Sequence, residues 1–391
     1  MKTRIAVLTT TRADYGILKN LILELEESKI FDLSLVISGT HLSKLHGNTI
    51  DEIKLPNNFV KIDILDYRSR KQNPNKVFTN AVSGFESYIG SSRPSAIVVL
   101  GDRYEVLGFA WAAYSSLVPI IHIHGGELTF GALDDQIRHC LTKLSYFHFV
   151  ACEEYRKRVI QLGEHPSRVF NVGALGLDAI KKRQFLNKQE LSDAMNFKLK
   201  RYFSVTLHPE TTSLSGKKEM LNKIFNALLD LKDYQFIFTA SNIDKHADEF
   251  NKIVKTFCTG KANFRFYESL GSIKYLSLLR NSQGIIGNSS SGILEAPFLK
   301  IPTINIGNRQ KGRVMTQSII SLDEGFTSTE LKRAIHTISS DSFLEILRGT
   351  KNPFGNGNTA KQMLKILEKG IFKELSLQPL KKEFFDISYE I

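Results

Sequence analysis

Residues 96–105 read AIVVLGDRYE, a run of five apolar residues followed by a glycine and a charged corner. An uninterrupted apolar run predicts a strand buried on both faces, since a half-exposed strand would alternate apolar and polar side chains. Residues 104–113 then have the pattern of a helix. A buried strand that passes through a short polar loop into a helix is the repeating unit of parallel α/β sheets.

The same unit recurs along the chain. In the first half, strands are expected at residues 5–8, 33–37, 60–64, 96–100, 119–123, 147–150 and 169–172, with helices at 17–25, 77–89, 104–113, 134–144 and 154–162. In the second half, strands are expected at 203–207, 235–239, 264–267, 284–286 and 302–306, with helices at 218–231, 244–257, 273–280 and 291–299. Two doubly wound α/β domains are therefore predicted, with a cleft at the carboxyl ends of both sheets.

The domain limits are predicted from a change of composition. A polar, helix-prone stretch at 181–200 follows the sequence GALG at 173–176. We expect a first Rossmann-like domain at 1–177, a second at 178–360, and a final segment at 361–391 that returns toward the first. A chain of 391 residues is long for a single hydrophobic core, which agrees with two domains.

Composition excludes several classes of protein. With 42% hydrophobic and 24% charged residues the chain has the composition of a globular protein, and it contains no apolar run of 18 residues. We therefore expect no membrane partner. The net charge of +12 comes from lysines scattered beside leucines, without a basic run interleaved with aromatics, so nucleic acid is not expected either. A positive field would still attract a nucleotide.

The cysteines and the start of the chain suggest a cytoplasmic protein. Cys140, Cys152 and Cys258 lie far apart without a CxxC spacing, which argues against a disulfide framework and a zinc ribbon. The first apolar run, at residues 5–8, is too short for the core of a signal peptide and reads better as a strand.

Polar groups follow one predicted strand after another. Asp14 comes after the first strand and His41 after the second, while Asp102 and Arg103 follow the strand at 96–100 and His208 the strand at 203–207. The carboxyl ends of parallel strands meet at one edge of a sheet. A shared site explains so many polar strand ends better than a separate cap at each one.

The sequence GNSSSG at 287–292 is the best phosphate candidate. It lies between a predicted strand and a predicted helix, where backbone N–H groups and the helix dipole favour an anion. Glu295, in the first turn of that helix, could accept hydrogen bonds from ribose hydroxyls or could simply complement the dipole. Arg309 and Arg313 could neutralise phosphate or lie on the surface.

The sequence HIHGGE at 122–127 allows two kinds of chemistry. His122 and His124, at i and i+2 of a strand, would point the same way like a metal-binding pair, with Glu127, Asp134 or His139 completing the set. Alternatively, Asp102, Glu127 and Asp134 would converge as an acid/base site, since crowded carboxylates can hold a proton near neutrality. We expect the acid/base site, without a metal.

The sequence contains no GxGxxG fingerprint after the first strand and no Walker lysine, so no dinucleotide or ATP is expected.

These motifs together resemble the hydrolysing UDP-N-acetylglucosamine 2-epimerases, above all the bacterial type that makes N-acetylmannosamine for sialic acid. The resemblance runs from the first strand to about residue 315. It implies a GT-B-like fold with two Rossmann-like domains, a homodimer or homotetramer, and no metal or nicotinamide cofactor. The matching stretches are TRADYG at 11–16, LGDRYE at 100–105, HIHGGE at 122–127, IRH at 137–139, HPET at 208–211, GNSSSG at 287–292 and GNRQKGR at 307–313.

The reaction that the resemblance implies is elimination of UDP from UDP-N-acetylglucosamine to 2-acetamidoglucal, followed by hydration to N-acetylmannosamine. Asp102 and Asp134 match the catalytic carboxylates, and His208 matches a histidine that contacts phosphate. With His124 and Glu127 these are the candidate catalytic residues. The residues assigned to UDP-sugar binding are Arg12, Asp14, His41, Arg103, Asn242, Ser289, Ser290, Ser291, Glu295 and Arg309.

This chain departs from the family pattern at one position, because many members carry a catalytic glutamate where it has His124. Either His124 takes the acid/base role, or Glu127 supplies the carboxylate from three residues on. Relative to many members, this chain also has one extra residue between Glu127 and Asp134, so Asp135 could take part in place of Asp134 or beside it.

Other activities compete with this interpretation. The same reaction on UDP-N,N'-diacetylbacillosamine, for legionaminic acid, stays open. A GT-B glycosyltransferase would share the fold but would leave Asp102 and Asp134 without a task. A UDP-sugar sensor would bind UDP without turnover.

Overall fold

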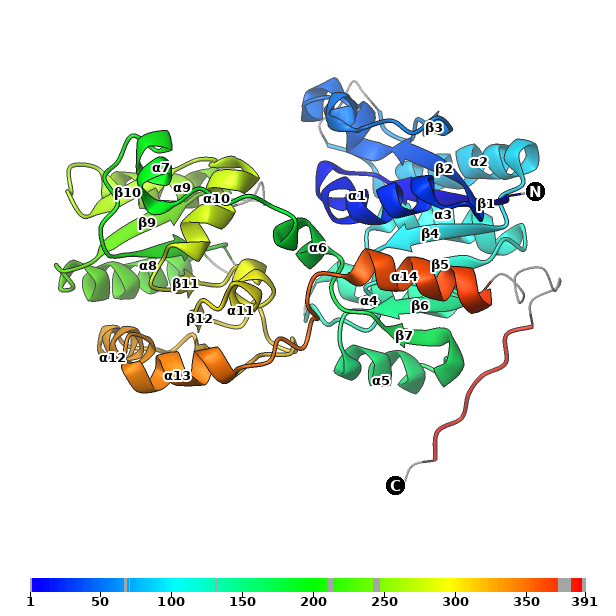
Figure 1. The fold of residues 1–391 in the computed structure, drawn as a ribbon. Helices are drawn as coiled ribbons and strands as arrows, with labels where there is room; N and C mark the ends of the chain where they lie inside the picture. Colours follow the sequence, from blue (N-terminus) through cyan, green and yellow to red (C-terminus); the bar gives the residue numbers. More distant parts are fainter. Residues whose placement is uncertain are drawn as a thin grey trace. The chain divides into compact units, whose positions relative to one another are not determined.

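The computed structural model describes residues 2–66, 69, 71–130, 132–209, 214–241, 247–371 and 381–388. The chain forms two compact units, one made of Met1–Lys181 with Pro353–Ile391 and the other of Lys182–Asn352. Each unit contains one parallel sheet covered by helices (Figure 1). Within the described residues, no helix is long and apolar enough to cross a lipid bilayer.

The sheet of the first unit has seven parallel strands within the described residues, in the order β3-β2-β1-β4-β5-β6-β7. The strands are β1 (Thr3–Thr9), β2 (Phe31–Ser38), β3 (Phe59–Ile62), β4 (Ala96–Leu100), β5 (Ile120–Ile123), β6 (Phe147–Val150) and β7 (Val169–Asn171). The helices are α1 (Arg12–Glu27), α2 (Pro74–Ser92), α3 (Tyr104–Ser115), α4 (Leu133–Leu144), α5 (Glu153–Gln161), α6 (Gly176–Lys181) and α14 (Thr359–Ile366). The strand order reverses between β1 and β4, which is where open α/β sheets bind ligands.

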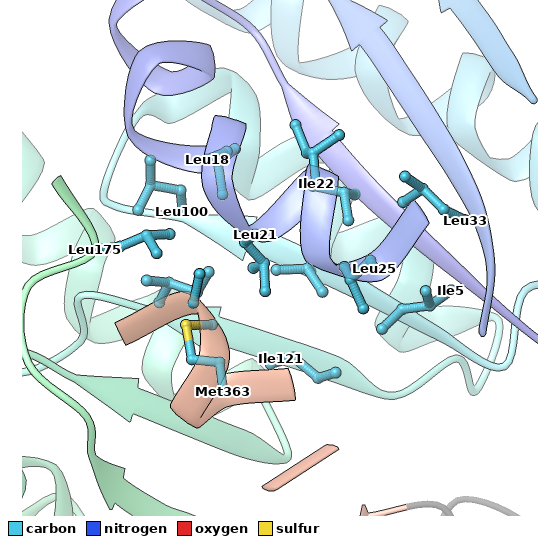
Figure 2. Packing of buried hydrophobic residues seen from close by; sticks show 14 of the residues in the cluster. Ile5, Leu18, Leu21, Ile22, Leu25, Leu33, Leu100, Ile121, Leu175 and Met363 are labelled. Atoms are coloured by element: carbon cyan, nitrogen blue, oxygen red, sulfur yellow. The ribbon is translucent and has the colours of Figure 1, made fainter. Parts of the chain in front are cut away.

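Helices α1 and α14 pack against the same face of this sheet, although they lie far apart in the sequence (Figure 1). Figure 2 shows Leu21 and Leu25 of α1 in one cluster with Ile121 of β5 and Met363 of α14. All four side chains are fully buried, and each contributes about 1.5–3 kcal/mol by leaving water. Residues from α2, α3 and α4 cover the other face.

The start of α14 is held by Asp178 of α6. The backbone N–H groups of Thr359 and Ala360 donate to its two carboxylate oxygens at 2.8 and 2.7 Å. N–H groups in the first turn have no partner inside the helix, so a carboxylate there satisfies them and complements the helix dipole. The cap and the apolar packing together attach α14 to the first unit.

The second unit contains a six-stranded parallel sheet, again within the described residues, in the order β10-β9-β8-β11-β12-β13. The strands are β8 (Tyr202–Thr206), β9 (Gln235–Thr239), β10 (Phe264–Tyr267), β11 (Ile285–Gly287), β12 (Thr303–Ile306) and β13 (Ile319–Leu322). The helices are α7 (Lys188–Ala194), α8 (Leu214–Leu229), α9 (Ala247–Cys258), α10 (Gly271–Arg280), α11 (Glu295–Leu299), α12 (Ser328–Ile338) and α13 (Asp341–Gly349). Buried phenylalanines such as Phe203, Phe236 and Phe238 fill one face of this sheet.

Three features of the second unit differ from the sequence prediction. Strand β13 was missed because it is an edge strand with only partly buried and exposed residues. Helices α12 and α13 were missed although both have clear caps, with a capping box at Thr327. The helix predicted at 291–299 is wrong in extent. A 3-10 turn, η5 (Ser290–Gly292), precedes an α-helix that begins only at Glu295, where Pro297 suits a first turn but would clash with a longer helix.

Residues 381–388 of the tail pack onto the first unit around the buried carboxylate of Glu164. Its oxygens accept from Lys143 and Lys382 at 2.8 Å each and from His148 at 3.1 Å. Lys382 also donates to the carbonyls of Lys143 and Ser145, at the end of α4. Burial alone would raise the pKa of Glu164, but the contacts with His148, Lys382 and Lys143 outweigh it and lower the pKa to about 2.

We expect Glu164→Gln to destabilise the first unit by about 3 kcal/mol at neutral pH, because it removes the buried charge that Lys382 and Lys143 pair with. The pKa of Glu164 falls on folding, so the ionised form contributes stability above about pH 4.5, and this is lost as pH falls toward 2. Urea unfolding at pH 7 and pH 3 should show that the free energy of unfolding falls less between these pH values in the variant than in the wild type. Glu153→Gln, at an exposed ion pair with Arg156, is the control and should change stability by less than about 0.5 kcal/mol. Equal acid sensitivity of wild type and Glu164→Gln would contradict the prediction.

Candidate active site

The polar ends of β1, β4 and β5 meet at the carboxyl edge of the first sheet. Beyond β1, the Thr10 hydroxyl lies 2.8 Å from an Asp14 oxygen and 3.2 Å from a Glu105 oxygen. Arg103 donates to that same Glu105 oxygen at 2.5 Å. Burial raises the pKa of Asp14, while Thr10 and Arg103 act in the opposite direction. Asp14 and Arg103, predicted as neighbours in one site, are thus joined by Thr10 and Glu105, which sequence reasoning did not assign.

A second group of charges links β4 to α4. Asp102 forms an ion pair with Arg138, whose guanidinium also donates to Thr129 at 3.2 Å. Asp134, in the first turn of α4, interacts electrostatically with Asp102. Burial raises the pKa of Asp134, and the negative charge of Asp102 raises it further. The structure therefore places an ion-paired carboxylate beside a carboxyl group that holds its proton more tightly than usual.

Arg138 is the residue of this group that sequence reasoning left unassigned. It lies four residues after Asp134 on α4, a spacing that puts both side chains on the same face of the helix. That spacing is the signal that could have found it. The sequence left open whether Asp135 belongs to this group. In the structure it contacts other residues, because it accepts from the backbone N–H of Thr129 at 2.5 Å and lies 3.8 Å from His139.

His122 and His124 do not form a metal-binding pair. Strand β5 ends at Ile123, and His124 has a φ of +66°, so the expected alternation stops before it. His122 is fully buried and donates from Nε2 to the Gly101 carbonyl at 2.8 Å, and burial lowers its pKa to about 3. The described residues contain no group of three His, Cys, Asp or Glu side chains that could hold a metal ion.

His124 instead contacts Glu127 and the loop before α6. Its Nδ1 lies 3.3 Å from a Glu127 oxygen, and its Nε2 accepts from the Leu175 N–H at 3.4 Å. The turn between the two residues requires glycine at 126, since φ is +79° and a Cβ would lie 2.4 Å from the Tyr155 carbonyl. The side chains of His124 and Glu127 are 15% and 9% exposed.

The remaining predicted residues of the first unit lie in different surroundings. His41 is fully buried, with its ring nitrogens 3.0 Å from Thr9 and 2.9 Å from Thr49, and burial lowers its pKa to about 4. Arg12 is exposed and ion-paired with Glu52 at 2.8 Å. The structure thus keeps His41 inside the unit and Arg12 on its surface.

In the second unit, Asn288 organises the end of β11. Its side chain accepts from the His208 N–H at 2.7 Å and donates to the His208 carbonyl at 2.9 Å. Its own carbonyl accepts from Arg309 at 3.1 Å and from Gln310 at 2.8 Å. Burial and the positive charge of Arg309 lower the pKa of His208 to about 4. His208, Arg309 and the loop that begins at Gly287 are therefore brought together as predicted from their strand ends.

A second set of side chains lies around the serines. Tyr275 of α10 is in hydrogen-bonding contact with Ser291, Thr206 and Ser289, and burial raises its pKa to about 12. Burial also raises the pKa of Glu295, which contacts Ser291. Tyr275 was not found from the sequence, because a tyrosine among leucines of a helix reads as core. Ser290 lies in η5 between the other two serines. Asn242 lies outside the described residues.

Buried polar atoms without a partner occur in both units. Within the described residues they include Glu105 Oε2 and Arg138 Nη1 in the first unit, and His208 Nδ1, Gln310 Oε1 and Glu295 Oε2 in the second. Such atoms are rare in folded proteins because each costs free energy unless a ligand or water satisfies it. A polar ligand such as a nucleotide would supply the missing partners.

Two parallel-sheet α/β units with polar strand ends place the protein in the GT-B-like class, and solved structures agree. The chain is similar to a UDP-N-acetylglucosamine 2-epimerase of Neisseria meningitidis bound to UDP-GlcNAc, with a TM-score of 0.76, 18% identity, and 94% of this chain and 100% of that one covered. The corresponding protein of Listeria monocytogenes gives a TM-score of 0.77 at 16% identity, covering 99% and 100%. The predicted fold class is confirmed.

The chain belongs to the UDP-N-acetylglucosamine 2-epimerase family, which residues 23–368 match. It is 37% identical to the polysialic acid biosynthesis protein P7 of Escherichia coli over 388 residues, covering 98% of this chain and 97% of that one. It is 40% identical to the GDP/UDP-N,N'-diacetylbacillosamine 2-epimerase (hydrolyzing) of Campylobacter jejuni over 339 residues, covering 85% and 88%. The predicted family is confirmed, and so is the prediction that the chain is an enzyme.

Proposed function

We propose that this enzyme converts UDP-N-acetylglucosamine to N-acetylmannosamine and UDP, by elimination to 2-acetamidoglucal and hydration, for the biosynthesis of sialic acid. The observation that carries the proposal is the pair formed by Asp102, ion-paired with Arg138, and Asp134, whose pKa is raised beside it. A reaction that removes a proton from C2 and returns one on the other face needs a base and an acid in one site. The Asp102 carboxylate, held by Arg138, suits the base, and Asp134, whose pKa burial raises, suits the acid.

In the elimination step, the Asp102 carboxylate takes the C2 proton while the bond between C1 and the UDP oxygen breaks. The C2 proton is only weakly acidic, so the base has to be held in place, and Arg138 holds it. In the hydration step, the protonated Asp134 gives its proton to C2 while the oxygen of water bonds to C1 and one proton of that water passes to a base or to solvent. Asp102 and Asp134 then exchange with solvent to restore their starting states.

UDP is the leaving group, and the second unit carries the groups that suit it. Arg309 supplies positive charge, and Ser289, Ser290 and Ser291 supply hydroxyls and N–H groups near the end of β11. Donors that meet negative charge as it develops stabilise the transition state as well as the product. Glu295 and Tyr275, which contact the same loop, suit the hydroxyls of the nucleoside.

A second substrate is favoured by one observation. The Campylobacter jejuni relative, 40% identical, is named for UDP-N,N'-diacetylbacillosamine, and turnover of that sugar by the same steps would serve legionaminic acid. NMR of the sugar formed from each candidate UDP-sugar tests the proposal. N-acetylmannosamine from UDP-N-acetylglucosamine supports the proposal, and turnover of the bacillosamine derivative alone would make that sugar nucleotide the substrate instead.

A homodimer or homotetramer and a cytoplasmic location stay predictions, which sedimentation and fractionation would test.

We expect Ser290→Ala to weaken UDP binding by about 1 kcal/mol, roughly fivefold in Kd, because one hydrogen bond to phosphate is lost. Calorimetric titration with UDP measures this directly. Ser342→Ala, on the exposed side of α13, is the matched control and should leave Kd unchanged. An unchanged Kd for Ser290→Ala would remove that hydroxyl from the nucleotide site.

A further inference from the structure

The backbone fixes the ring of His124 in an unusual position. A φ of +66° is in the left-handed region, which residues other than glycine rarely adopt and which costs free energy to maintain. The His124 N–H donates to the Phe149 carbonyl of β6 at 2.9 Å, so the residue is held in place at the end of the sheet. Arg158 holds the following turn by donating to the Gly126 carbonyl. Five other non-glycine residues in the described part of the chain also have a positive φ, so the backbone explains how the ring of His124 is held, and its contacts have to show what it does.

The contacts of His124 determine its tautomer. A backbone N–H can only donate, so the nitrogen that receives the Leu175 N–H, Nε2, carries no proton. The proton of the neutral ring is then on Nδ1, which lies 3.3 Å from the Glu127 oxygen. Both ring nitrogens are thus engaged by the protein itself.

The other carboxylates at this edge have contacts of their own. Asp14 accepts from Thr10, Glu105 accepts from Thr10 and Arg103 through one oxygen while its other oxygen is buried without a partner, and Asp135 accepts from the backbone of Thr129. In the proposed function Asp102 and Asp134 serve the two proton transfers at C2. The water that adds at C1 still needs a base, and the carboxylate that remains is the one that His124 orients.

We propose that His124 is a positioning residue, fixed as the Nδ1-protonated tautomer, and that Glu127 is the base that activates water in the hydration step. This inference rests on the proposed function. As the water oxygen bonds to C1 of the glucal, one water proton passes to the Glu127 carboxylate while the Asp134 proton passes to C2. Glu127 later returns its proton to solvent. The imidazole gains and loses no proton in the cycle.

Hydration is measured separately from elimination by supplying 2-acetamidoglucal with UDP and following N-acetylmannosamine by NMR. Glu127→Gln should lower hydration by on the order of 10²-fold, so that with UDP-N-acetylglucosamine it releases UDP and accumulates glucal. His124→Asn tolerates the left-handed backbone and keeps an N–H donor for Glu127. It should lower hydration by only about threefold to tenfold, whereas His124→Ala should lower it further.

Three outcomes would overturn the inference. The first is hydration that falls by 10²-fold or more in folded His124→Asn but less than tenfold in Glu127→Gln, which would make the imidazole the proton carrier. The second is equal loss of elimination and hydration in Glu127→Gln. The tautomer is read independently of activity from the ¹⁵N spectrum of labelled histidine, with His124→Asn identifying the signal. A proton on Nε2 would refute the assigned tautomer, and this readout does not depend on activity. If the wild type released no UDP, that result would refute the proposed function instead.

Discussion

Asp102→Asn should lower kcat for UDP release by on the order of 10²-fold or more while UDP still binds. The amide keeps the size and hydrogen-bonding shape of the side chain but cannot take the C2 proton. Elimination and hydration also exchange that proton with solvent. Wild-type turnover in D₂O should therefore give a mannosamine product that carries deuterium at C2, which proton NMR measures.

The control for this prediction is a second aspartate paired with arginine. Asp32 and Arg4 form an ion pair of 3.1 Å at the starts of β2 and β1, at the opposite edge of the same sheet. Asp32→Asn should leave kcat unchanged, which separates loss of the base from loss of an ion pair. A protonated C2 in product formed in D₂O would refute the proposed mechanism, and wild-type turnover by Asp102→Asn would remove Asp102 from it.

Gly287→Ala should destabilise the second unit by more than about 3 kcal/mol and abolish UDP binding. Gly287 ends β11 with a φ of +140°, and a Cβ there would lie 1.9 Å from the carbonyl oxygen of Thr206. Thr206 is paired with Gly287 in the sheet and also accepts from the Asn288 N–H, so its backbone cannot move without breaking the sheet. The same shift would displace the serines that follow.

The same substitution at Gly90 is expected to have the opposite effect on stability. Gly90 lies inside α2, and a Cβ there meets nothing within 4 Å. Alanine should stabilise the first unit by about 0.5–1 kcal/mol, because it loses less backbone freedom on folding. Thermal unfolding and UDP titration of both variants test the pair. A Gly287→Ala protein with the melting temperature and the UDP affinity of the wild type would contradict the prediction, because it would show that the backbone can shift away from the Thr206 carbonyl at little cost.

The local pattern of apolar and polar residues is enough to predict most elements of the first unit. Apolar runs such as 96–100 and 147–150 are buried strands β4 and β6, because a segment buried on both faces cannot contain polar residues. Asp102 and His208 also follow the ends of β4 and β8, as the strand pattern predicts, and a parallel sheet brings its carboxyl ends to one edge. Pattern alone missed β13, because an edge strand buries too little to show the signal.

Only the tertiary structure shows which distant residues the individual site residues contact. Arg138 pairs with Asp102 across 36 positions, and His124 receives a hydrogen bond from Leu175 across 51. Lys382 of the tail reaches the buried Glu164 and the end of α4. Periodicity reports which side of an element is apolar, but not which distant element covers it, so these contacts leave no local signal. The amino-acid sequence by itself determined the fold class and the edge of the sheet where polar residues gather. The raised pKa of Asp134 and the roles proposed for His124 and Glu127 depend on neighbours that folding alone brings together.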